Sequence, residues 1–408
     1  RASGQQRSNR AVQAACAPRL REFGRRSKWR DFRHADTLSQ IEPSDRRPML
    51  CLAEAYFHTL DPFAVQFPPS WPVAGIRWYG LSYAAGFVCA YLLLRWFAAA
   101  KRSPLTVPQA GDLMFAIIVG VLVGGRLGHA VFGYNFAELW TFSNQFPYWE
   151  LLAINRGGMS SHGGIVGVIL ACWWFGRRHG IDVLHLFDMS ALGGTAGLFM
   201  GRLANFVNGE LHGRAVADQI NPPWWSMKFP QEMTEWSATK LASLQDVVQH
   251  IGVSSAEWLS AISTPTTDAA LPYGAATPMV ENTVQRLIHE TQTGNQTIIE
   301  GLRPHLTAFY PSQLIQALTD GPILAAFLCV LWLRPRKPGV IAMWWLIGYG
   351  VLRMITELWR EPDQGVALTF GILSRGQTLS VLMILAGLAG LCLAVRRNVP
   401  KMGGLLKN

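Results

Sequence analysis

The feature of this chain that most constrains its fold is an arginine within a run of residues apolar enough to lie in lipid. Residues 197–214 read GLFMGRLANFVNGELHGR, which puts Arg202 near the end of the apolar run. A guanidinium at that depth costs about 2.5 to 3.5 kcal/mol even on lenient insertion scales, so it has to be paired or to bind a charged group. Arg202 is therefore the first candidate for a functional residue, although an arginine near a helix end can also reach the lipid headgroups.

The composition indicates a membrane protein. Of 408 residues, 50% are hydrophobic and only 15% are charged, whereas soluble domains carry about 25% charged residues. A helix of about 20 apolar residues crosses a bilayer core, and seven runs reach or approach that length: 78–98, 111–132, 161–176, 185–207, 311–333, 339–358 and 377–395. We therefore predict an all-α integral membrane protein with about seven transmembrane helices, of which 161–176 is short.

Basic residues follow every second predicted helix and indicate the orientation, because cytoplasmic loops are enriched in Lys and Arg. These residues are Lys101, Arg102, Arg177, Arg178, Arg334, Arg336, Lys337, Arg396, Arg397 and Lys401. The connections on the other side are acidic or mixed, and residues 209–310 carry ten Asp/Glu against five Lys/Arg. We expect a cytoplasmic C-terminus, a start of the first helix on the outer side of the membrane, and a cap on that side between helices 4 and 5.

This organisation divides the chain into four parts. We expect residues 1–60 to be a basic extension, 61–214 to hold helices 1–4, 215–305 to form the cap, and 306–408 to hold helices 5–7 and a cytoplasmic tail. Residues 1–48 carry 12 Lys/Arg against 5 Asp/Glu without apolar periodicity, which is typical of disorder. Because exporting this charge conflicts with the orientation, Met49 is a candidate start of the functional protein. The extension has neither interleaved aromatics nor a folded motif, so nucleic-acid binding is not favoured.

Two groups of polar residues lie at the outer ends of predicted helices. Asn205 and Asn208 follow Arg202 at intervals of three, which keeps them near one helical face, and Glu210 comes next. On the sixth helix, polar residues recur at spacings of four, four and three: Tyr349, Arg353, Glu357 and Arg360. Such a stripe has to face a bundle interior or a wet cavity. An ion pair within the stripe that only staples helices is the plainer alternative.

Two further groups contain a histidine and another arginine. The glycine-rich loop 156–164 enters the third helix and contains His162. Glycines let the backbone approach a ligand, and a histidine there can act as a base near neutral pH, although alone in such a turn it is more often structural. Arg126 lies among glycines of the second helix that permit close helix packing, and Glu357 or Glu210 is its candidate counter-charge.

Three or four arginines and few acids thus converge on the outer half of a small bundle, which suits an anionic, partly lipophilic molecule such as a phospholipid headgroup. Tyr79 opens the first helix, where aromatic residues also form simple interfacial belts. A transporter of an organic anion would equally explain buried arginines and glycine-broken helices, but it predicts an inverted repeat, and the two halves of the sequence show none. A purely structural subunit leaves the asymmetric placement of the polar groups unexplained.

The motif from Gly201 to Gly213, GRLANFVNGELHG, resembles the signature of the prolipoprotein diacylglyceryl transferase family. Supporting motifs follow the family's order: Arg77–Gly80, Gly124–Gly128, Gly157–Ser160, His162–Gly164, Pro311–Leu314 and Arg353–Asp363. The resemblance covers residues 60–398. The chain departs from the commoner family pattern at Ser161, His212 and Gln316, which bears on recognition of the peptide substrate. His212 is a weaker second candidate for acid–base chemistry.

The resemblance implies a bacterial inner-membrane enzyme with seven spans and an active site in the periplasmic half. It also implies the reaction, in which the diacylglyceryl group of phosphatidylglycerol moves to the lipobox cysteine of a preprolipoprotein. A thioether forms and glycerol phosphate is released. No metal or organic cofactor is expected.

The same resemblance assigns roles to individual residues. Arg202 and Arg353 would hold the phosphate, and His162 would be the base that takes the thiol proton, helped by Tyr79. The remaining binding residues would be Asn205, Glu210, Glu357, Arg126, Gly213 and Tyr349, with Asn205 and Glu210 orienting headgroup hydroxyls or the base and Glu357 positioning Arg353.

Overall fold

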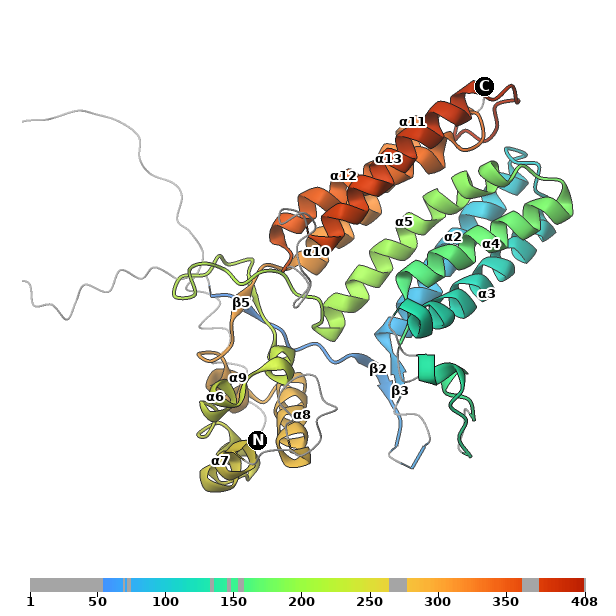
Figure 1. Cartoon of the computed structure of the whole chain (residues 1–408). Helices are drawn as coiled ribbons and strands as arrows, with labels where there is room; N and C mark the ends of the chain where they lie inside the picture. Colours follow the sequence, from blue (N-terminus) through green and yellow to red (C-terminus); the bar gives the residue numbers. More distant parts are fainter. Residues whose placement is uncertain are drawn as a thin grey trace, which may run out of the picture. The chain divides into compact units, whose positions relative to one another are not determined.

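The computed structural model describes residues 54–406 apart from 69, 72–74, 133–135, 145–147, 153–157, 264–276 and 362–373. Residues 1–53, which include most of the expected basic extension and the candidate start Met49, lie outside the described residues. The described part of the chain is mainly helical (Figure 1).

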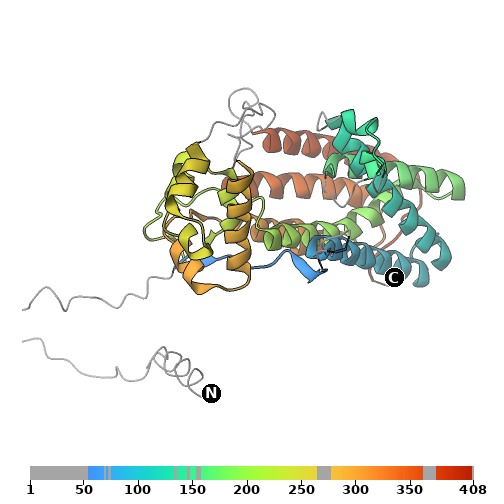
Figure 2. The ribbon, with the colours of Figure 1, turned by 90° about the horizontal axis from the view of Figure 1, so that it is seen from below.

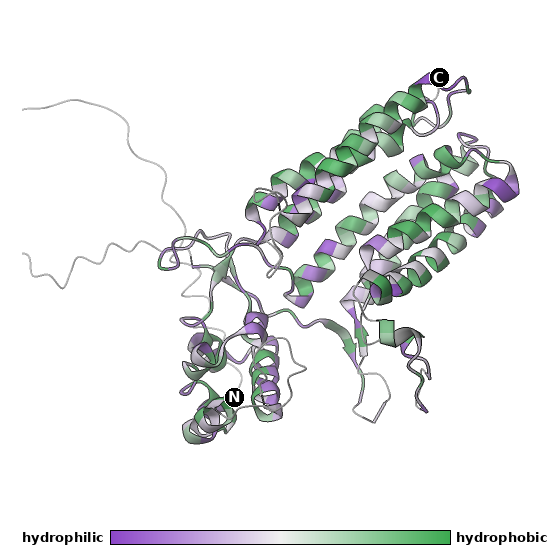
Figure 3. Ribbon diagram, viewed as in Figure 1, coloured by the Kyte–Doolittle hydropathy of each residue, from purple (hydrophilic) through white to green (hydrophobic). Residues whose placement is uncertain are grey.

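Six helical segments of the described chain are long and apolar enough to cross a membrane. They are α2 (Trp78–Ala99), α3 (Val107–Phe132), α5 (Val183–Asn208), the segment Ser312–Leu331, α12 (Val340–Thr356) with its 3₁₀ turn Glu357–Trp359, and α13 (Arg375–Arg396). The segment Ser312–Leu331 consists of α10 (Ser312–Leu318), a π-helical turn (Thr319–Ile323) and α11 (Leu324–Leu331). Each helix begins and ends close to a predicted apolar run, and apolar residues dominate these helices in Figure 3. The chain is therefore a mainly helical integral membrane protein.

The short seventh run is also a helix, α4 (Ser161–His179), but it does not belong to the six apolar segments. The prediction of seven spans is therefore not confirmed. α4 packs along α3, where Gly163 and Gly167 meet the backbone of Gly124 and Gly120. A side chain at any of these four positions would overlap the facing helix, so the close packing expected of the second helix is confirmed.

The basic ends of the predicted helices meet at one end of the bundle. Arg397, just after α13, donates to the Asp182 carboxylate before α5 at 2.8 and 3.3 Å. Lys337 Nζ, before α12, donates to the Val395 carbonyl at 2.6 Å. Arg102, after α2, donates to two carbonyls of the C-terminal tail. The basic residues that follow alternate helices in the sequence thus lie at the same end of the folded bundle.

The segment between α5 and α10, which was predicted to form the cap, has its own hydrophobic core. Its helices are α6 (Ala238–Ala242), α7 (Ser255–Ser263), α8 (Pro278–Gln292) and α9 (Gln296–Leu302), with 3₁₀ turns at Pro230–Glu235 and Val248–Ile251 (Figures 1 and 2). Trp258 and Leu287 are fully buried in this core. The Trp258 indole N–H donates to the Leu241 carbonyl at 3.0 Å, so the one polar atom of that side chain is satisfied.

Five short strands accompany the helices of this predominantly α-helical chain. Parallel β1 (Tyr56–Phe57) and β4 (Met227–Lys228) pair, β4 pairs antiparallel with β5 (Ala308–Phe309), and β2 (Phe63–Gln66) pairs antiparallel with β3 (Gly75–Arg77). Strands of two to four residues are too short to show an alternating pattern. They nevertheless fix the entries into the bundle, because β3 runs directly into α2 and β5 lies just before α10.

His58 joins this sheet to the end of α5. Its Nε2–H donates to the Phe206 carbonyl at 2.8 Å, and its ring packs against Phe206 and Phe229. Burial lowers the pKa of His58 to about 4, so the side chain is neutral at physiological pH. A neutral histidine can be packed between aromatic rings without a counter-charge.

A buried carboxylate caps the start of α12. Asp188, on α5 and only 2% exposed, accepts hydrogen bonds from the N–H groups of Gly339 and Ala342, both at 2.8 Å. The first N–H groups of a helix have no partner within the helix. Gly339 is the N-cap residue of α12 and has no side chain to cap them. Asp188 on α5 therefore accepts the hydrogen bonds of the first N–H groups of α12.

Replacing Asp188 with alanine removes both acceptors. We expect the free energy of unfolding to fall by about 1 to 3 kcal/mol, the usual cost of buried donors left unpaired, as measured by unfolding in detergent micelles. Asp112→Ala, an exposed carboxylate on α3, is the matched control and should change the stability by less than about 0.5 kcal/mol. Equal stability of the Asp188→Ala variant and the wild type would contradict the capping role.

Candidate functional site

Two arginines face buried carboxylates where α5, the π-helical turn and α12 meet. Arg202 Nε lies 3.9 Å from Asp320 Oδ2, and Asp320 is fully buried. Arg353 Nη2 lies 3.1 Å from Glu357 Oε2, with both side chains largely buried. Both guanidiniums also act electrostatically on Asp320. Arg202 therefore faces a buried carboxylate within the bundle, which argues against an arginine that merely reaches for lipid headgroups.

Glu357 holds Arg353 and connects it to the next span. The Ser374 hydroxyl, which caps the start of α13, donates to Glu357 Oε1 at 2.8 Å. A Cβ atom at Gly376 would lie 3.0 to 3.3 Å from the charged atoms of both Arg353 and Glu357, so this glycine leaves room for the pair. Arg353 Nη1 is buried and has no hydrogen-bond partner among the described residues. The pair therefore does more than staple helices, since it leaves a buried donor for another group.

Tyr349 completes the charged cluster one turn before Arg353. The Arg202 guanidinium donates to the Tyr349 hydroxyl. The ring stacks on Trp345, with 5.1 Å between centroids and planes 2° apart. Tyr349 and Arg353 of the polar stripe predicted on the sixth helix thus face the bundle interior.

A second polar cluster joins the starts of α2 and α10 to the end of α5. Asn205 Nδ2 donates to Glu210 Oε1 at 2.8 Å, and Asn205 is also hydrogen-bonded to Tyr79. Gln313 Nε2, in the first turn of α10, donates to the Glu210 carbonyl at 2.8 Å. The spacing of the asparagines predicted that these groups lie on the side of α5 that carries Arg202. The structure brings Tyr79, Asn205 and Glu210 together, as a binding site requires.

His162 lies in the first turn of α4 and is exposed. The Ser160 hydroxyl caps this helix by accepting from the Gly163 N–H at 3.3 Å. α4 packs mainly against α3, and the described contacts do not place His162 in the charged cluster. Arg156 and Gly157 of the same loop lie outside the described residues. A role of His162 as the base therefore stays a prediction from the motif.

Arg126 is buried and clamps the loop that precedes α4. Its guanidinium donates to three main-chain carbonyls, those of Glu150, Leu151 and Gly158, at 2.6 to 2.8 Å. Three of its acceptors are thus backbone carbonyls, and an ion pair of Arg126 with Glu357 or Glu210 stays a prediction. Main-chain carbonyls can accept hydrogen bonds from a buried guanidinium in this way. The sequence pattern did not indicate these acceptors.

Gly213 lies where three segments meet. Its N–H donates to the Tyr310 carbonyl at 3.1 Å, and it bridges to Arg360 after the end of α12. A Cβ atom at this position would collide with the carbonyl oxygens of Tyr310 and Trp359. Gly213 therefore allows the end of α5, the start of α10 and the end of α12 to approach closely. The structure gives it a backbone role beside the site.

Buried polar residues of α10 and the π-helical turn form one side of the site, and the spacing of charged residues did not predict them as binding residues. Gln313, Gln316 and Asp320 recur at intervals of three and four on α10 and the π-helical turn, and all three are buried. Gln313 Oε1, Gln316 Nε2 and Asp320 Oδ2 have no hydrogen-bond partner among the described residues. Buried polar atoms without partners are rare and call for an explanation such as a bound ligand or water. Asp320 is an acidic residue inside a predicted apolar run, and such a residue is the expected counter-charge for a buried arginine. This feature of the sequence could have identified it.

The cluster can bind an anion but has no arrangement for a metal. Guanidinium groups in a site of low dielectric form strong, directional hydrogen bonds to phosphate or carboxylate oxygens. Within the described part of the chain, no three His, Cys, Asp or Glu side chains converge closely enough to hold a metal ion.

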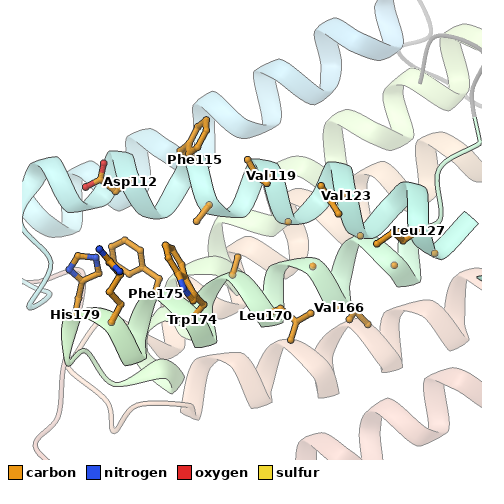
Figure 4. Close-up of a pocket in the computed structure, with 18 of the residues that line it drawn as sticks. Asp112, Phe115, Val119, Val123, Leu127, Val166, Leu170, Trp174, Phe175 and His179 are labelled. Atoms are coloured by element: carbon orange, nitrogen blue, oxygen red, sulfur yellow. The ribbon is translucent and has the colours of Figure 1, made fainter. Parts of the chain in front are cut away.

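A separate groove of about 910 Å³ runs between α3 and α4 (Figure 4). Its walls are apolar, and the labelled polar residues Asp112 and His179 lie together at one end. Arg178, which precedes His179 on α4, also lines the groove. None of its lining residues belongs to the charged cluster. The groove suits hydrocarbon rather than a charged headgroup, so it is not the candidate reaction site.

Comparison with known proteins gives a consistent result. Residues 66–393 match the family model described as prolipoprotein diacylglyceryl transferase. Three relatives carry the name phosphatidylglycerol–prolipoprotein diacylglyceryl transferase. The protein of Bdellovibrio bacteriovorus is 41% identical over 81% of this chain and 92% of its own length. Those of Photorhabdus laumondii and Psychrobacter arcticus are 35% and 32% identical, over 81% and 84% of this chain and 91% and 96% of their own lengths.

Gly213→Ala should strain the junction beside the site. We expect the added methyl group to push apart the segments around Tyr310 and Trp359 and to lower the free energy of unfolding by about 1 to 3 kcal/mol, measured by thermal unfolding in micelles. Gly194→Ala on α5, where a Cβ atom meets nothing within 4 Å, is the matched control and should be neutral or slightly stabilising. A Gly213→Ala variant as stable as this control would show that the close approach is unimportant.

Proposed function

The chain belongs to the prolipoprotein diacylglyceryl transferase family, and we propose that it transfers the diacylglyceryl group of phosphatidylglycerol to the lipobox cysteine of preprolipoproteins. The sulfur–carbon bond of a thioether forms, the bond between the glycerol carbon and the phosphate oxygen breaks, and glycerol phosphate leaves with that electron pair. The names of the relatives state the donor, the acceptor and the transferred group.

The observation that carries this proposal is the pair of arginines sunk into the bundle. The leaving phosphate gains a second negative charge as its bond to carbon breaks. Fixed cations in a site with little water stabilise such developing charge, because they need no reorganisation during the reaction. The buried, unpartnered Nη1 of Arg353 and the partly exposed Arg202 leave donors for phosphate oxygens.

We propose that His162 is the base that accepts the proton of the lipobox thiol, and that Tyr79 assists it. The nucleophile is the thiolate, and a cysteine thiol with a pKa near 8.5 is mostly protonated at neutral pH. A base is therefore needed, and a histidine titrates in the right range. The hydrogen bond of Tyr79 to Asn205 supports a place for Tyr79 beside the headgroup.

The other residues bind or shape the site. Asn205 and Glu210 orient the hydroxyls of the glycerol headgroup or the base. Tyr349 and Glu357 hold the two arginines through the contacts described above. Arg126 and Gly213 act through the backbone, since Arg126 fixes the loop before α4 and Gly213 lets three segments meet.

We further propose that the protein lies in the bacterial inner membrane with seven spans, α4 being the seventh. The N-terminal end of α2 and the cap at 215–305 face the periplasm, and the C-terminus is cytoplasmic. The gathering of basic residues at one end of the bundle supports this orientation, because such residues are retained in the cytoplasm. The charged cluster then lies in the periplasmic half, where secreted preprolipoproteins arrive.

Transport of an organic anion is the weaker alternative. Buried arginines and helices rich in glycine occur in transporters as well. The halves of this sequence show no inverted repeat, and the names of the relatives all describe group transfer.

Removing either arginine should abolish most of the transfer. We expect Arg202→Ala and Arg353→Ala to lower kcat/KM by at least about 100-fold, the usual loss when one stabilising donor is removed. The assay uses purified protein, labelled phosphatidylglycerol and a lipobox peptide. Arg334→Ala, an exposed arginine at the other end of the bundle, is the matched control. Near-normal transfer by either of the two variants would refute the phosphate site.

His162→Gln tests the base separately. We expect a loss of about 100-fold or more in kcat, because glutamine cannot accept the thiol proton. An unchanged kcat would remove His162 from proton transfer and leave it an orienting role at most.

Thiol labelling tests the orientation in a variant whose native cysteines are replaced. Glu281→Cys lies on the exposed face of α8 in the cap, and Lys401→Cys lies in the exposed C-terminal tail. An impermeant maleimide added to spheroplasts should label the first position directly and the second only after permeabilisation. The reverse pattern would invert the proposed orientation.

A further inference from the structure

The charged cluster is electrically balanced before any lipid binds. Arg202 and Arg353 supply two positive charges, and Asp320 and Glu357 supply two negative ones. Glu357 is committed to its neighbours, through Arg353 at 3.1 Å and Ser374 at 2.8 Å. Asp320 is not, since its nearest guanidinium atom lies 3.9 Å away and both arginines act on it.

Asp320 is buried yet weakly hydrogen-bonded. Its Oδ2 has no hydrogen-bond partner among the described residues, and its Oδ1 accepts only a long bond of 3.3 Å from the Thr319 hydroxyl. It lies in a π-helical turn, a rare form that is frequent at functional sites. Gly321 beside it packs so closely on Phe199 that a side chain would collide. The fold therefore keeps a nearly bare carboxylate beside two guanidiniums.

The groups around Asp320 come from three elements. Arg202 faces it from α5, Arg353 and Tyr349 face it from α12, and Thr319 precedes it in its own turn. Glu357 is the nearest other acid that the contacts connect to this cluster, through Arg353. Asp320 is thus the one carboxylate of the cluster that a second anion could replace without breaking a short ion pair.

The product of the proposed reaction carries more negative charge than the substrate and is therefore harder to release from a site with two arginines. Phosphatidylglycerol carries one negative charge on its phosphodiester, whereas glycerol phosphate carries close to two near neutral pH. The attraction to a fixed pair of guanidiniums grows in proportion to the charge of the ligand. Two uncompensated arginines would therefore hold the product, and slow product release limits turnover in many enzymes.

We propose that Asp320 is an internal counter-anion that positions Arg202 and Arg353 between turnovers and competes with the phosphate for them, which promotes release of the anionic product. This inference rests on the proposed function. Asp320 acts through the arginines and not on the reacting atoms, so it is a positioning residue. A balanced cluster binds a phosphate by hydrogen bonds more than by net charge.

A purely structural counter-ion would behave in the opposite way. If Asp320 only kept the arginines in place, its loss would disorder them and weaken the binding of every phosphate. If Asp320 competes with phosphate, its loss strengthens phosphate binding. The affinity for a phosphate with two negative charges then rises more than the affinity for one with a single charge. The sign of the change therefore distinguishes the two roles.

The test compares Asp320→Asn with the wild type in the full-length protein. We expect the KM for phosphatidylglycerol to fall about tenfold and the inhibition constant of glycerol phosphate to fall about 100-fold, because the removed repulsion doubles with ligand charge and the fold-change is squared. The kcat should fall as product release slows. Asp320→Glu keeps the charge and should restore an inhibition constant close to that of the wild type.

Asp188→Asn is the matched control, since Asp188 is also a buried carboxylate on a span but contacts α12 at its other end. It should leave both constants unchanged. If KM and the inhibition constant rise or stay the same in a folded Asp320→Asn variant, the counter-anion role is overturned. If the wild type neither binds phosphatidylglycerol nor transfers its diacylglyceryl group, the proposed function itself fails, which is a different outcome.

The wild type provides a test that does not depend on folding of a variant. Glycerophosphoglycerol is a soluble diester with one negative charge and the same headgroup. Because a balanced cluster responds little to ligand charge, glycerol phosphate should inhibit no more than about threefold more strongly than this diester. Inhibition by glycerol phosphate that is more than about 30-fold stronger would overturn the proposal.

Discussion

A guanidinium buried in an apolar helix bundle persists only when other charges or hydrogen-bond acceptors surround it, and this requirement organises the structure around Arg202. Asp320 on a neighbouring span faces its guanidinium, and Tyr349 on another accepts a hydrogen bond from it. Arg353 meets the same requirement through Glu357, which is itself held by Ser374 at the start of α13. Four spans thus contribute to one cluster. Its function follows from the donors that this pairing leaves unused.

The surrounding fold holds the helix ends in register with that cluster. Asn205 and Glu210 link the end of α5 to α2 through Tyr79 and to α10 through Gln313. Close backbone contacts do the same elsewhere, since Gly213 joins α5, α10 and the end of α12. The opposite end is held by Asp188, which caps α12 from α5. A phosphate between these elements would contact groups whose positions are set before it binds, which is the condition for electrostatic stabilisation of a transition state.

The sequence predicted those features that depend on local pattern. Apolar runs located the spans, and spacings of three and four placed Asn205 beside Arg202 and Glu357 beside Arg353, because both follow from the helical period. Partners distant in sequence were not predictable in this way. Asp320 was missed inside an apolar run, and so were the three main-chain carbonyls that accept hydrogen bonds from Arg126. The strands were missed because two to four residues show no period. The family motifs identified the remaining site residues, but the place of His162 relative to the cluster does not follow from them.

The central claim is that the two buried guanidiniums hold the phosphate of the lipid. Solid-state NMR tests it most directly, by measuring dipolar coupling between the phosphorus of bound phosphatidylglycerol and ¹³C-labelled arginine Cζ atoms, with Arg202→Lys and Arg353→Lys variants to assign the signals. Hydrogen bonds of guanidinium to phosphate place these atoms about 4 to 5 Å apart. We expect couplings of that size from both residues. Absence of coupling from both, with bound lipid present, would contradict the claim.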